Sequence, residues 1–487
     1  MRHMASFFER KHRLAILGGG PGGYEAALAG AQLGADVTVV ERAGIGGAAV
    51  LTDVVPSKSL IATAEAATAI AGSTDLGVQF FIRGENGRAS KPEVTVNYRA
   101  VSERLLRLAR QQSDDMTSQL KRAGVKVVQG EGRLDGPNTL IVSTGHAGTD
   151  FDEINADTIV VSVGASPRVL PTAVPDGERI LNWKQVYELD TLPQRLIVVG
   201  SGVTGAEFAS AFTALGSKVT LVSSRDQVLP GEDADAASVI ENVFRRNGMT
   251  VLNKSRAKRV SRTDDGVVVE LADGRSVEGS HCLIAVGAVP NTSGIGLEEA
   301  GVELTRSGHI AVNRVARTSI PSIYAAGDCS DLLPLASVAQ MQGRTAVFHA
   351  LGDAVMPIEL RNVASNIFTQ PEIATVGWSQ KQIEAGIAQG EIVKIDLAAG
   401  NARAKMQGIR DGFVKLFART GSGTVIGGVI VAPRASELVF GVSLAVEHRL
   451  TVDQVSRAFS VYPSLTGAIT DAARALHIVQ PPPTNPD

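Results

Sequence analysis

Cysteine is nearly absent from this sequence, which has only Cys282 and Cys329 among its 487 residues. Cys282 lies in an apolar run, Cys329 follows a Gly-Asp pair, and no Cys-x-x-Cys motif or Cys/His cluster occurs. Zinc and iron–sulfur centres therefore lack ligands in this chain, and no metal site is expected. Both cysteines are predicted to be small packing residues.

A strong charge of one sign and a long apolar run are also missing. The net charge is −3 and the isoelectric point is near 6.3, which argues against nucleic acid as the main partner. No apolar run reaches membrane-spanning length and no secretory signal is recognisable, so a cytoplasmic protein without a membrane span is expected.

Glycine and apolar residues, by contrast, are abundant. The chain has 51 glycines and is 44% hydrophobic, with only 4% aromatic residues. This profile is typical of a soluble α/β enzyme with many tight strand-to-helix turns. A chain of this length is expected to form two to four domains.

Two segments repeat one strand–helix–strand pattern. The first begins "LAILGGGPGGYEAAL", reaches a strand end at Glu41, and carries the glycines Gly18, Gly20 and Gly23. The second begins "LIVVGSGVTGAEFAS", reaches a strand end near Ser223, and carries the glycines Gly200, Gly202 and Gly205. In such a motif the glycines permit the turn, the approach of a pyrophosphate and close helix–strand packing, while N–H groups at the helix start bind the phosphates. The chain is therefore predicted to contain two Rossmann-like units that bind two dinucleotides.

The chain changes character from about residue 355. Strand-like runs such as "GFVKLFAR" and "GTVIGGVIVAP" there alternate with helical stretches, which predicts a separate α+β domain. Before it, apolar strands that end in glycine at 158–171 and 281–292 are expected to mark crossings between domains.

Together these motifs resemble the pyridine nucleotide–disulfide oxidoreductases, the family of lipoamide dehydrogenase, glutathione reductase and mercuric reductase. The resemblance spans about residues 14 to 473. It includes both fingerprints in order, Pro-Ser-Lys, Tyr-Ala-Ala-Gly-Asp, "FTQPEIATVG" and "NARAK". It implies an α/β fold with two Rossmann-like dinucleotide-binding domains plus a C-terminal α+β dimerisation domain. The implied parts are an FAD-binding domain at 12–155 and 288–352, an NAD(P)H-binding domain at 156–287, a dimerisation domain at 353–476, and a disordered tail at 477–487.

The resemblance also implies FAD, with NADH or NADPH as electron donor, and a homodimer. Glu41 would hydrogen-bond the adenosine ribose of FAD and Asp328 would contact its ribitol–pyrophosphate region. Lys58 would lie beside flavin N5, paired with Glu207. The implied cofactor-binding residues are Gly18, Gly20, Pro21, Gly22, Gly23, Glu41, Arg42, Gly46, Gly47, Ala48, Lys58, Gly132, Ser162, Val163, Gly164, Asp328, Leu335, Ala336, Gly200, Ser201, Gly202, Val203, Thr204, Gly205, Glu207, Ser223, Ser224, Arg225 and Gly287.

The sequence departs from the family where disulfide chemistry takes place. Disulfide-using members carry Cys-x-x-x-x-Cys before Pro-Ser-Lys, and the aligned positions here are Ala49 and Val54. The family's C-terminal His-Pro and Glu are replaced by Tyr462 before proline and by Gly467. Thiol–disulfide exchange needs a thiolate and a group that handles its proton. Reduction of lipoamide or glutathione disulfide by the family mechanism is therefore excluded.

What remains is the half of the machinery that accepts hydride from NAD(P)H. A pocket of Ala49, Val54 and the other subunit's Tyr462 would be apolar with one hydroxyl, which suits a flat acceptor such as a quinone or a dye. The segments "GIGGAAV" and "VYPSLTG" resemble the NAD(P)H:quinone reductase branch of actinobacteria. The predicted activity is an FAD-dependent NAD(P)H dehydrogenase (quinone), with Lys58, Glu207 and Tyr462 as catalytic candidates. Two alternatives stay open: a pyridine nucleotide transhydrogenase and a non-catalytic flavoprotein sensor or scaffold.

The donor preference depends on the end of the second strand in the second unit. NAD-selective units carry an acidic residue there, whereas this chain has Ser223, followed by Ser224 and Arg225. NADP-selective relatives add a second basic residue where this chain has Pro230. Both donors are expected to be accepted. Ser223→Glu is expected to weaken NADPH use by about tenfold, or about 1.4 kcal/mol, and to spare NADH.

Overall fold

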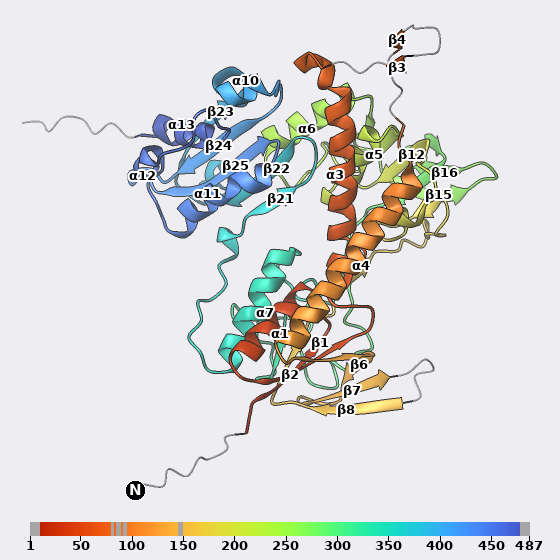
Figure 1. Ribbon diagram of the computed structural model, residues 1–487, viewed down its shortest axis with the longest axis vertical. Helices are drawn as coiled ribbons and strands as arrows, with labels where there is room; N and C mark the ends of the chain where they lie inside the picture. The colour runs from red at the N-terminus through yellow and green to blue at the C-terminus, as the bar shows by residue number, and fades with distance from the viewer. Residues whose placement is uncertain (1–9, 79–81, 84–88, 91–94, 145–149, 478–487) are drawn as a thin grey trace, which may run out of the picture. The chain divides into compact units, whose positions relative to one another are not determined.

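The structure, a computed structural model, describes residues 10–78, 82–83, 89–90, 95–144 and 150–477. These residues form two compact units. The first contains the described residues of 1–57, 102–168 and 287–359, and the second contains those of 58–101, 169–286 and 360–487. Each unit has its own sheets, and Figure 1 labels several of their strands.

A five-stranded parallel sheet forms the centre of the first unit. Three of its five strands are almost fully buried apolar runs, as expected where both faces of a sheet are covered, and in β1 the four residues after Arg13 are all buried. In spatial order the strands are β20 (Ile323–Ala325), β9 (Thr158–Val161), β1 (Arg13–Leu17), β2 (Asp36–Glu41) and β5 (Lys126–Gln129).

Three helices accompany this sheet. They are α1 (Pro21–Gln32), α4 (Tyr98–Arg122) and α7 (Ala336–Ala350). Helices α1 and α7 lie side by side (Figure 1) because glycine lets their backbones approach: a Cβ added to Gly343 would lie 2.0 Å from the carbonyl oxygen of Gly22. The carboxyl end of β1 leads directly into the start of α1.

Smaller antiparallel sheets complete the first unit. One is three-stranded, with β7 in the middle, and the other joins two short strands from distant parts of the chain. These strands are β6 (Glu131–Leu134), β7 (Thr139–Thr144), β8 (Asp150–Asn155), β10 (Ala165–Pro167) and β19 (Ala288–Pro290).

The second unit repeats the parallel arrangement. A five-stranded parallel sheet is accompanied by helices α5 (Val203–Ala214) and α6 (Ala234–Arg246), and a three-stranded antiparallel sheet follows it. The parallel strands, in spatial order, are β11 (Ile180–Leu181), β18 (His281–Ile284), β12 (Arg195–Val199), β13 (Lys218–Val222) and β14 (Thr250–Leu252). The antiparallel strands are β15 (Ala257–Arg262), β16 (Val267–Leu271) and β17 (Ser276–Gly279).

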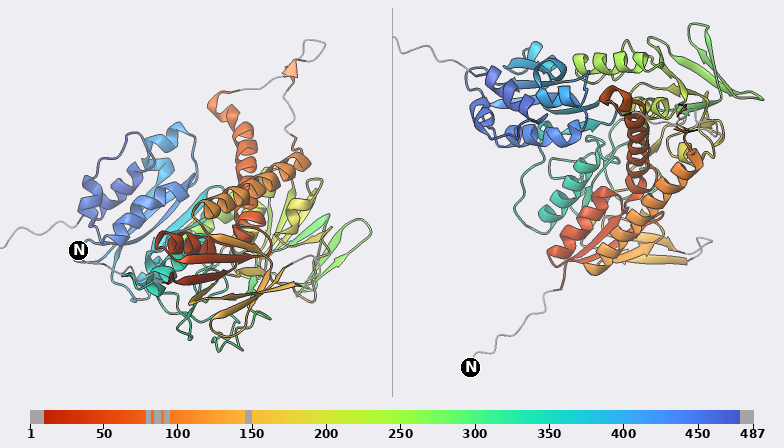
Figure 2. Two further views of the ribbon diagram at one scale, coloured as in Figure 1. Left: turned by 60° about the horizontal axis from the view of Figure 1, so that its bottom comes forward. Right: turned by 45° about the horizontal axis from the view of Figure 1, so that its top comes forward.

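The C-terminal part of the second unit is an antiparallel sheet packed with helices. Helix α11 (Ala435–Glu447) contacts β22 and β25, and α13 (Gly467–Ala475) contacts β23, β24 and α12 (Val452–Arg457); these elements are drawn in cyan to blue in Figure 2. In spatial order the strands are β21 (Ser365–Ile367), β22 (Glu372–Gly377), β25 (Val425–Ala432), β24 (Phe413–Ala418) and β23 (Glu391–Asp396).

The remaining elements connect these layers. Helix α3 begins in the first unit and enters the second at Lys58. The connecting elements are α2 (Gly47–Leu51), α3 (Val54–Ala71), η1 (Ser73–Leu76), β3 (Ile82–Arg83), β4 (Ala89–Ser90), η2 (Gln185–Glu188), η3 (Leu360–Asn362), α8 (Gln380–Glu384), α9 (Leu397–Gly400) and α10 (Ala402–Met406).

The predicted fold class is confirmed: two parallel α/β sheets precede an antiparallel α+β part. The predicted domain boundaries stay a prediction, and all of the predicted disordered tail except His477 lies outside the described residues. Among the helices of the described residues, none is long and apolar enough to cross a membrane.

Candidate functional site: two nucleotide-binding turns and an ion pair

The first glycine turn joins β1 to α1. Gly18 has φ +100°, and a Cβ added there would lie 2.3 Å from the Ser162 carbonyl oxygen, so only glycine fits. Gly20 caps α1 without a side-chain hydrogen bond, and a Cβ added to it would meet no atom closer than 3.8 Å. Protein atoms therefore leave space beside Gly20 at the start of α1, as a bound pyrophosphate requires.

Glu41, the last residue of β2, lies beside this turn. Its Oε2 accepts a hydrogen bond of 2.7 Å from the Gly19 N–H, and its Oε1 accepts one of 2.7 Å from the Ala43 N–H. These two bonds hold the carboxylate at the carboxyl end of the sheet. A carboxylate at this position binds a ribose hydroxyl in Rossmann units.

The loop that would carry the family's cysteines follows directly. The Gly46 N–H donates to the Gly19 carbonyl at 2.7 Å, which fixes the loop against the first turn. Ala49 then lies on α2 and Val54 begins α3 with a partly exposed side chain, so neither position offers a sulfur. The chain's two thiols are buried elsewhere, and burial raises the pKa of both, to about 11 for Cys329. They are packing residues, as predicted, with no nucleophilic thiolate.

The end of β20 and the start of α7 supply further polar groups. The carboxyl group of Asp328 lies just past β20, and burial raises its pKa. The preceding Gly327 N–H donates to Gln342 of α7 at 2.9 Å, which fixes this turn. Leu335 is the N-cap residue of α7, and its apolar side chain accepts no hydrogen bond from the first N–H groups of this helix.

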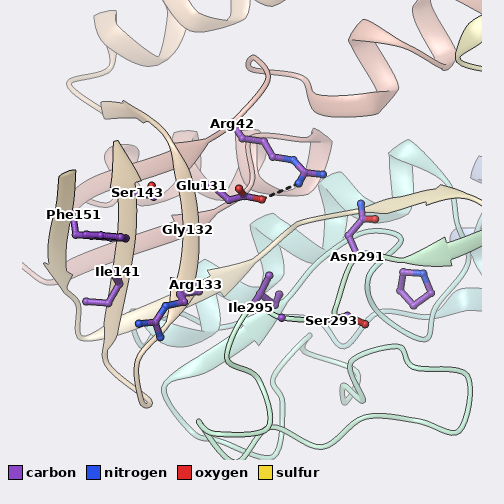
Figure 3. A pocket seen from close by; sticks show the side chains of 12 residues that line it. Arg42, Glu131, Gly132, Arg133, Ile141, Ser143, Phe151, Asn291, Ser293 and Ile295 are labelled. Carbon is purple, nitrogen blue, oxygen red and sulfur yellow. Dashed lines mark hydrogen bonds and ion pairs between the residues drawn. The ribbon is translucent and has the colours of Figure 1, made fainter. Parts of the chain in front are cut away.

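A cavity of about 470 Å³ opens near the end of β2 (Figure 3). Arg42 and Glu131 form an exposed ion pair of 3.3 Å on one side, and Asn291, Ser293 and Ile295 lie across from it. Arg42 and Gly132, both predicted as cofactor contacts, line this cavity, together with Glu131, Arg133, Ile141, Ser143, Phe151, Pro290, Asn291, Ser293, Gly294 and Ile295.

The second glycine turn, in the second unit, has the same geometry. Gly200 has φ +111°, and a Cβ added there would lie 2.2 Å from the Ala285 carbonyl oxygen. Gly202 caps α5 without a side-chain hydrogen bond, and a Cβ added to it would meet no atom within 4 Å. A second nucleotide-binding helix start is thus available.

The end of β13, which is predicted to select between NADH and NADPH, is lined by uncharged side chains. Ser223 follows β13 and is fully buried; its Oγ lies 2.7 Å from Ser201 Oγ and accepts from the Arg225 N–H at 3.2 Å. Its hydroxyl therefore belongs to the interior of the turn. Ser224 and Arg225 are exposed.

The structure brings Lys58 and Glu207 together. Lys58 Nζ donates to Glu207 Oε2 at 2.7 Å, while Glu207 Oε1 accepts from the Phe368 N–H at 2.8 Å. The Lys58 ammonium also lies 4.6 Å from the centre of the Phe368 ring. The Glu207 side chain is 7% exposed and that of Lys58 30%, so a buried carboxylate orients a cation that still reaches solvent.

The other predicted residues lie as follows. Ser162, Val163 and Gly164 follow β9, Gly287 precedes β19, and Ala48 lies on α2; all are in the first unit. Tyr462 lies in the second unit with its side chain 85% exposed, next to the exposed Phe459 and Val461.

Sequence reasoning missed two contributors. Phe368 is the first residue of the "FTQPEIATVG" segment that marks the family. Only the structure shows that its ring contacts the Lys58 ammonium and that its N–H donates to Glu207. Glu131 directly precedes the predicted contact Gly132, yet its pairing with Arg42 depends on strands distant in sequence. Among the described residues, no group of three or more His, Cys, Asp or Glu could hold a metal ion.

Comparison with known families gives a match over nearly the whole chain. Residues 12–343 match the pyridine nucleotide-disulphide oxidoreductases, and residues 363–473 match the dimerisation domain of the same family.

Individual relatives span the chain as well. An NAD(P)H dehydrogenase (quinone) from Mycobacterium tuberculosis is 51% identical over 471 residues, which cover 95% of this chain and 94% of that protein. A dihydrolipoyl dehydrogenase from Zymomonas mobilis is 31% identical over 488 residues, which cover 97% of this chain and 100% of that protein. The crystal structure of LpdA from Mycobacterium tuberculosis has a TM-score of 0.90 and 49% identity, covering 96% of this chain and 100% of the other.

Proposed function

The chain belongs to the pyridine nucleotide-disulphide oxidoreductase family, and from this premise we propose that it is an FAD-dependent NAD(P)H dehydrogenase that reduces quinones. One observation carries the proposal. Both glycine turns are complete, while the loop that carries the cysteines in disulfide-using members of the family has Ala49 and Val54 at those positions. The relative from Mycobacterium tuberculosis that bears the name NAD(P)H dehydrogenase (quinone) supports it.

FAD is proposed to bind the first unit. The open space before Gly20 fits a pyrophosphate, the Glu41 carboxylate fits the adenosine ribose, and the cavity at Arg42 and Gly132 fits the adenine end. The Asp328 carboxyl group, whose pKa is raised by burial, would contact the ribitol–pyrophosphate region. The other proposed contacts are Gly18, Pro21, Gly22, Gly23, Gly46, Gly47, Ala48, Ser162, Val163, Gly164, Gly287, Leu335 and Ala336.

NADH or NADPH is proposed to bind the second unit. The pyrophosphate would accept hydrogen bonds from the N–H groups at the start of α5, at Gly202, Val203 and Thr204, since a Cβ added to Gly202 would meet no atom within 4 Å. The adenosine ribose would lie at the end of β13. The remaining proposed contacts are Gly200, Ser201, Gly205, Glu207, Ser223, Ser224 and Arg225.

Bound FAD would supply the redox chemistry, accepting a hydride and returning two electrons to the acceptor without a protein redox centre. The protein's own part is positional. Glu207 holds the Lys58 ammonium at one place, and a fixed cation near a flavin stabilises negative charge that develops there. We assign Lys58 and Glu207 this role.

The acceptor is proposed to be a quinone bound in an apolar pocket. Ala49 and Val54 would line it, and the partner subunit's Tyr462 would offer one hydroxyl donor. The exposed side chains of Phe459, Val461 and Tyr462 in the dimerisation domain are consistent with a segment that a second subunit covers.

The test is steady-state oxidation of NADH and NADPH by the purified holoenzyme against a panel of acceptors. We expect turnover with benzoquinones and naphthoquinones and negligible turnover with lipoamide or glutathione disulfide. Quinone turnover should withstand thiol alkylation, because both cysteines are buried and outside the loop. Turnover with lipoamide would refute the proposal, transfer mainly to an NAD(P)+ analogue would favour transhydrogenase, and a flavin that NAD(P)H cannot reduce would favour a scaffold.

A further inference from the structure

The carboxyl ends of β13 and β14 lie side by side in the second unit. The strands pair in parallel, with Val222 opposite Leu252. Beyond the pairing, the Ser255 N–H donates to the Ser223 carbonyl at 2.7 Å and the Lys254 N–H donates to the Arg225 carbonyl at 2.8 Å. The backbone of Lys254 is therefore fixed next to that of Arg225, although the two are far apart in sequence.

The two nucleotide units differ at one equivalent point. In the first, the Glu41 carboxylate receives the N–H groups of Gly19 and Ala43. In the second unit Ser223 stands at the position of Glu41, and its hydroxyl oxygen accepts a hydrogen bond from the Arg225 N–H. The Ser201 Oγ lies 2.7 Å from the Ser223 Oγ and occupies the space that the rest of a glutamate side chain would fill. Two neutral hydroxyls thus fill a position that is anionic in the first unit, so this position has no carboxylate to repel a 2′-phosphate.

Several positively charged side chains lie near this uncharged end of β13. Arg225 is exposed, and its guanidinium has no partner among the described residues. The Lys254 side chain is 74% exposed and meets Asp226, itself exposed, only at 3.7 Å, a contact that a phosphate can readily replace. Arg275 is already occupied, since it pairs with Asp273 and donates to Ser255 Oγ at 2.7 Å. Arg225 and Lys254, whose backbones are hydrogen-bonded to each other, are thus two available cations among the described residues.

We propose that NADPH is the preferred donor and that Lys254, together with Arg225, selects it by binding the 2′-phosphate. This inference rests on the proposed function. The second cation that the sequence lacks at Pro230 comes instead from the end of the neighbouring strand. A phosphate oxygen would accept from the Lys254 ammonium and the Arg225 guanidinium, while NADH would gain nothing from either.

The first experiment compares Lys254→Gln with Lys218→Gln. Lys218 is an exposed lysine at the opposite end of β13, so the control makes the same change of charge away from the strand ends. We expect Lys254→Gln to lower kcat/KM for NADPH by about tenfold and to leave NADH unchanged, and we expect Arg225→Gln to lower the ratio of kcat/KM for NADPH to that for NADH by about tenfold, because each removes one charge-assisted hydrogen bond to the 2′-phosphate. Lys218→Gln should keep the wild-type ratio. An unchanged ratio in both Lys254→Gln and Arg225→Gln would overturn the proposal.

The second experiment measures binding alone. Calorimetry of the FAD-loaded protein should show adenosine 2′,5′-bisphosphate binding at least tenfold more tightly than 5′-AMP, with an advantage that falls as salt rises and shrinks in Lys254→Gln. Equal affinities would overturn the inference even if quinone reduction is intact. Selective binding without quinone turnover would refute the proposed function instead and leave this inference standing.

A third variant rebuilds the first unit's arrangement. Ser201→Gly with Ser223→Glu copies the pairing of Gly19 with Glu41 and should reverse the preference towards NADH. This double change improves on Ser223→Glu alone, in which the new carboxylate would meet the Ser201 hydroxyl. A double variant that binds NADH normally yet still prefers NADPH would contradict the assignment of this strand end.

Discussion

At the scale of single residues, the pairing of Lys58 with Glu207 is asymmetric. Glu207 is nearly buried and receives both Lys58 and the Phe368 N–H, whereas Lys58 is about one-third exposed. Loss of Lys58 leaves a buried carboxylate with one remaining donor, but loss of the Glu207 charge leaves an ammonium that water can reach. Unpaired buried charge is the more costly of the two.

We therefore predict that Lys58→Met destabilises the protein more than Glu207→Gln. The expected difference in the free energy of unfolding is about 1–2 kcal/mol, and the double variant should recover part of the loss. Denaturant unfolding of the FAD-loaded proteins measures it. Both variants should also slow reduction of the flavin by NADPH in stopped-flow measurements. Equal stability of the two single variants would contradict the asymmetry.

Residue identity was easier to predict than residue environment. The Lys58–Glu207 pair followed from the resemblance and is present, although its role stays a prediction. Ser223 was identified at the right strand end, but its full burial against Ser201 was not, because it depends on the turn that follows the neighbouring strand β12. The same is true of Lys254, whose relation to Arg225 is created by pairing of β13 with β14.

At the scale of elements, a buried lysine connects two parts of the second unit. Lys415 lies in the middle of β24, where the other residues are apolar, and its side chain is 2% exposed. Its Nζ donates to both Asp233 carboxylate oxygens at 2.8 Å and to Gln380 at 2.6 Å. Asp233 also caps α6, accepting the N–H groups of Asp235 and Ala236. One cation therefore ties a helix of the nucleotide-binding part to the C-terminal sheet.

Lys415→Met should be strongly destabilising, because it leaves the buried Asp233 carboxylate without its cation. We expect a loss of about 3–5 kcal/mol. The matched control is Lys394→Met on the neighbouring strand β23. Lys394 pairs with Asp235, but its side chain is 43% exposed, so the loss of this ion pair should cost less than about 1 kcal/mol. Thermal or denaturant unfolding compares the two. Similar losses in both variants would contradict the anchoring role of Lys415.

The elements themselves were unequally predictable. The strands and helices of both fingerprints were predicted because apolar strands and glycine turns mark them in sequence. The three-stranded sheet of β6, β7 and β8 was not predicted, since most residues of β8 are exposed and show no apolar alternation. Only pairing with β7, whose Leu140 and Val142 are buried, defines β8 as a strand.

At the scale of the whole molecule, the family scaffold is kept while its sulfur chemistry is missing. The fold, the two nucleotide turns and the dimerisation domain are all present. The family's two-electron disulfide is not, because Ala49 and Val54 replace its cysteines and the two remaining thiols are buried elsewhere. Each subunit should therefore store two electrons, where a disulfide-bearing relative stores four.

Anaerobic titration of the FAD-loaded protein with NADPH counts these electrons directly. The account predicts that flavin absorbance is lost completely at one NADPH per FAD, with no further uptake and no long-wavelength band from a thiolate next to the flavin. One equivalent of quinone should then restore the oxidised spectrum. Uptake of a second NADPH per FAD would reveal another redox pair and contradict the claim that electrons leave without a disulfide.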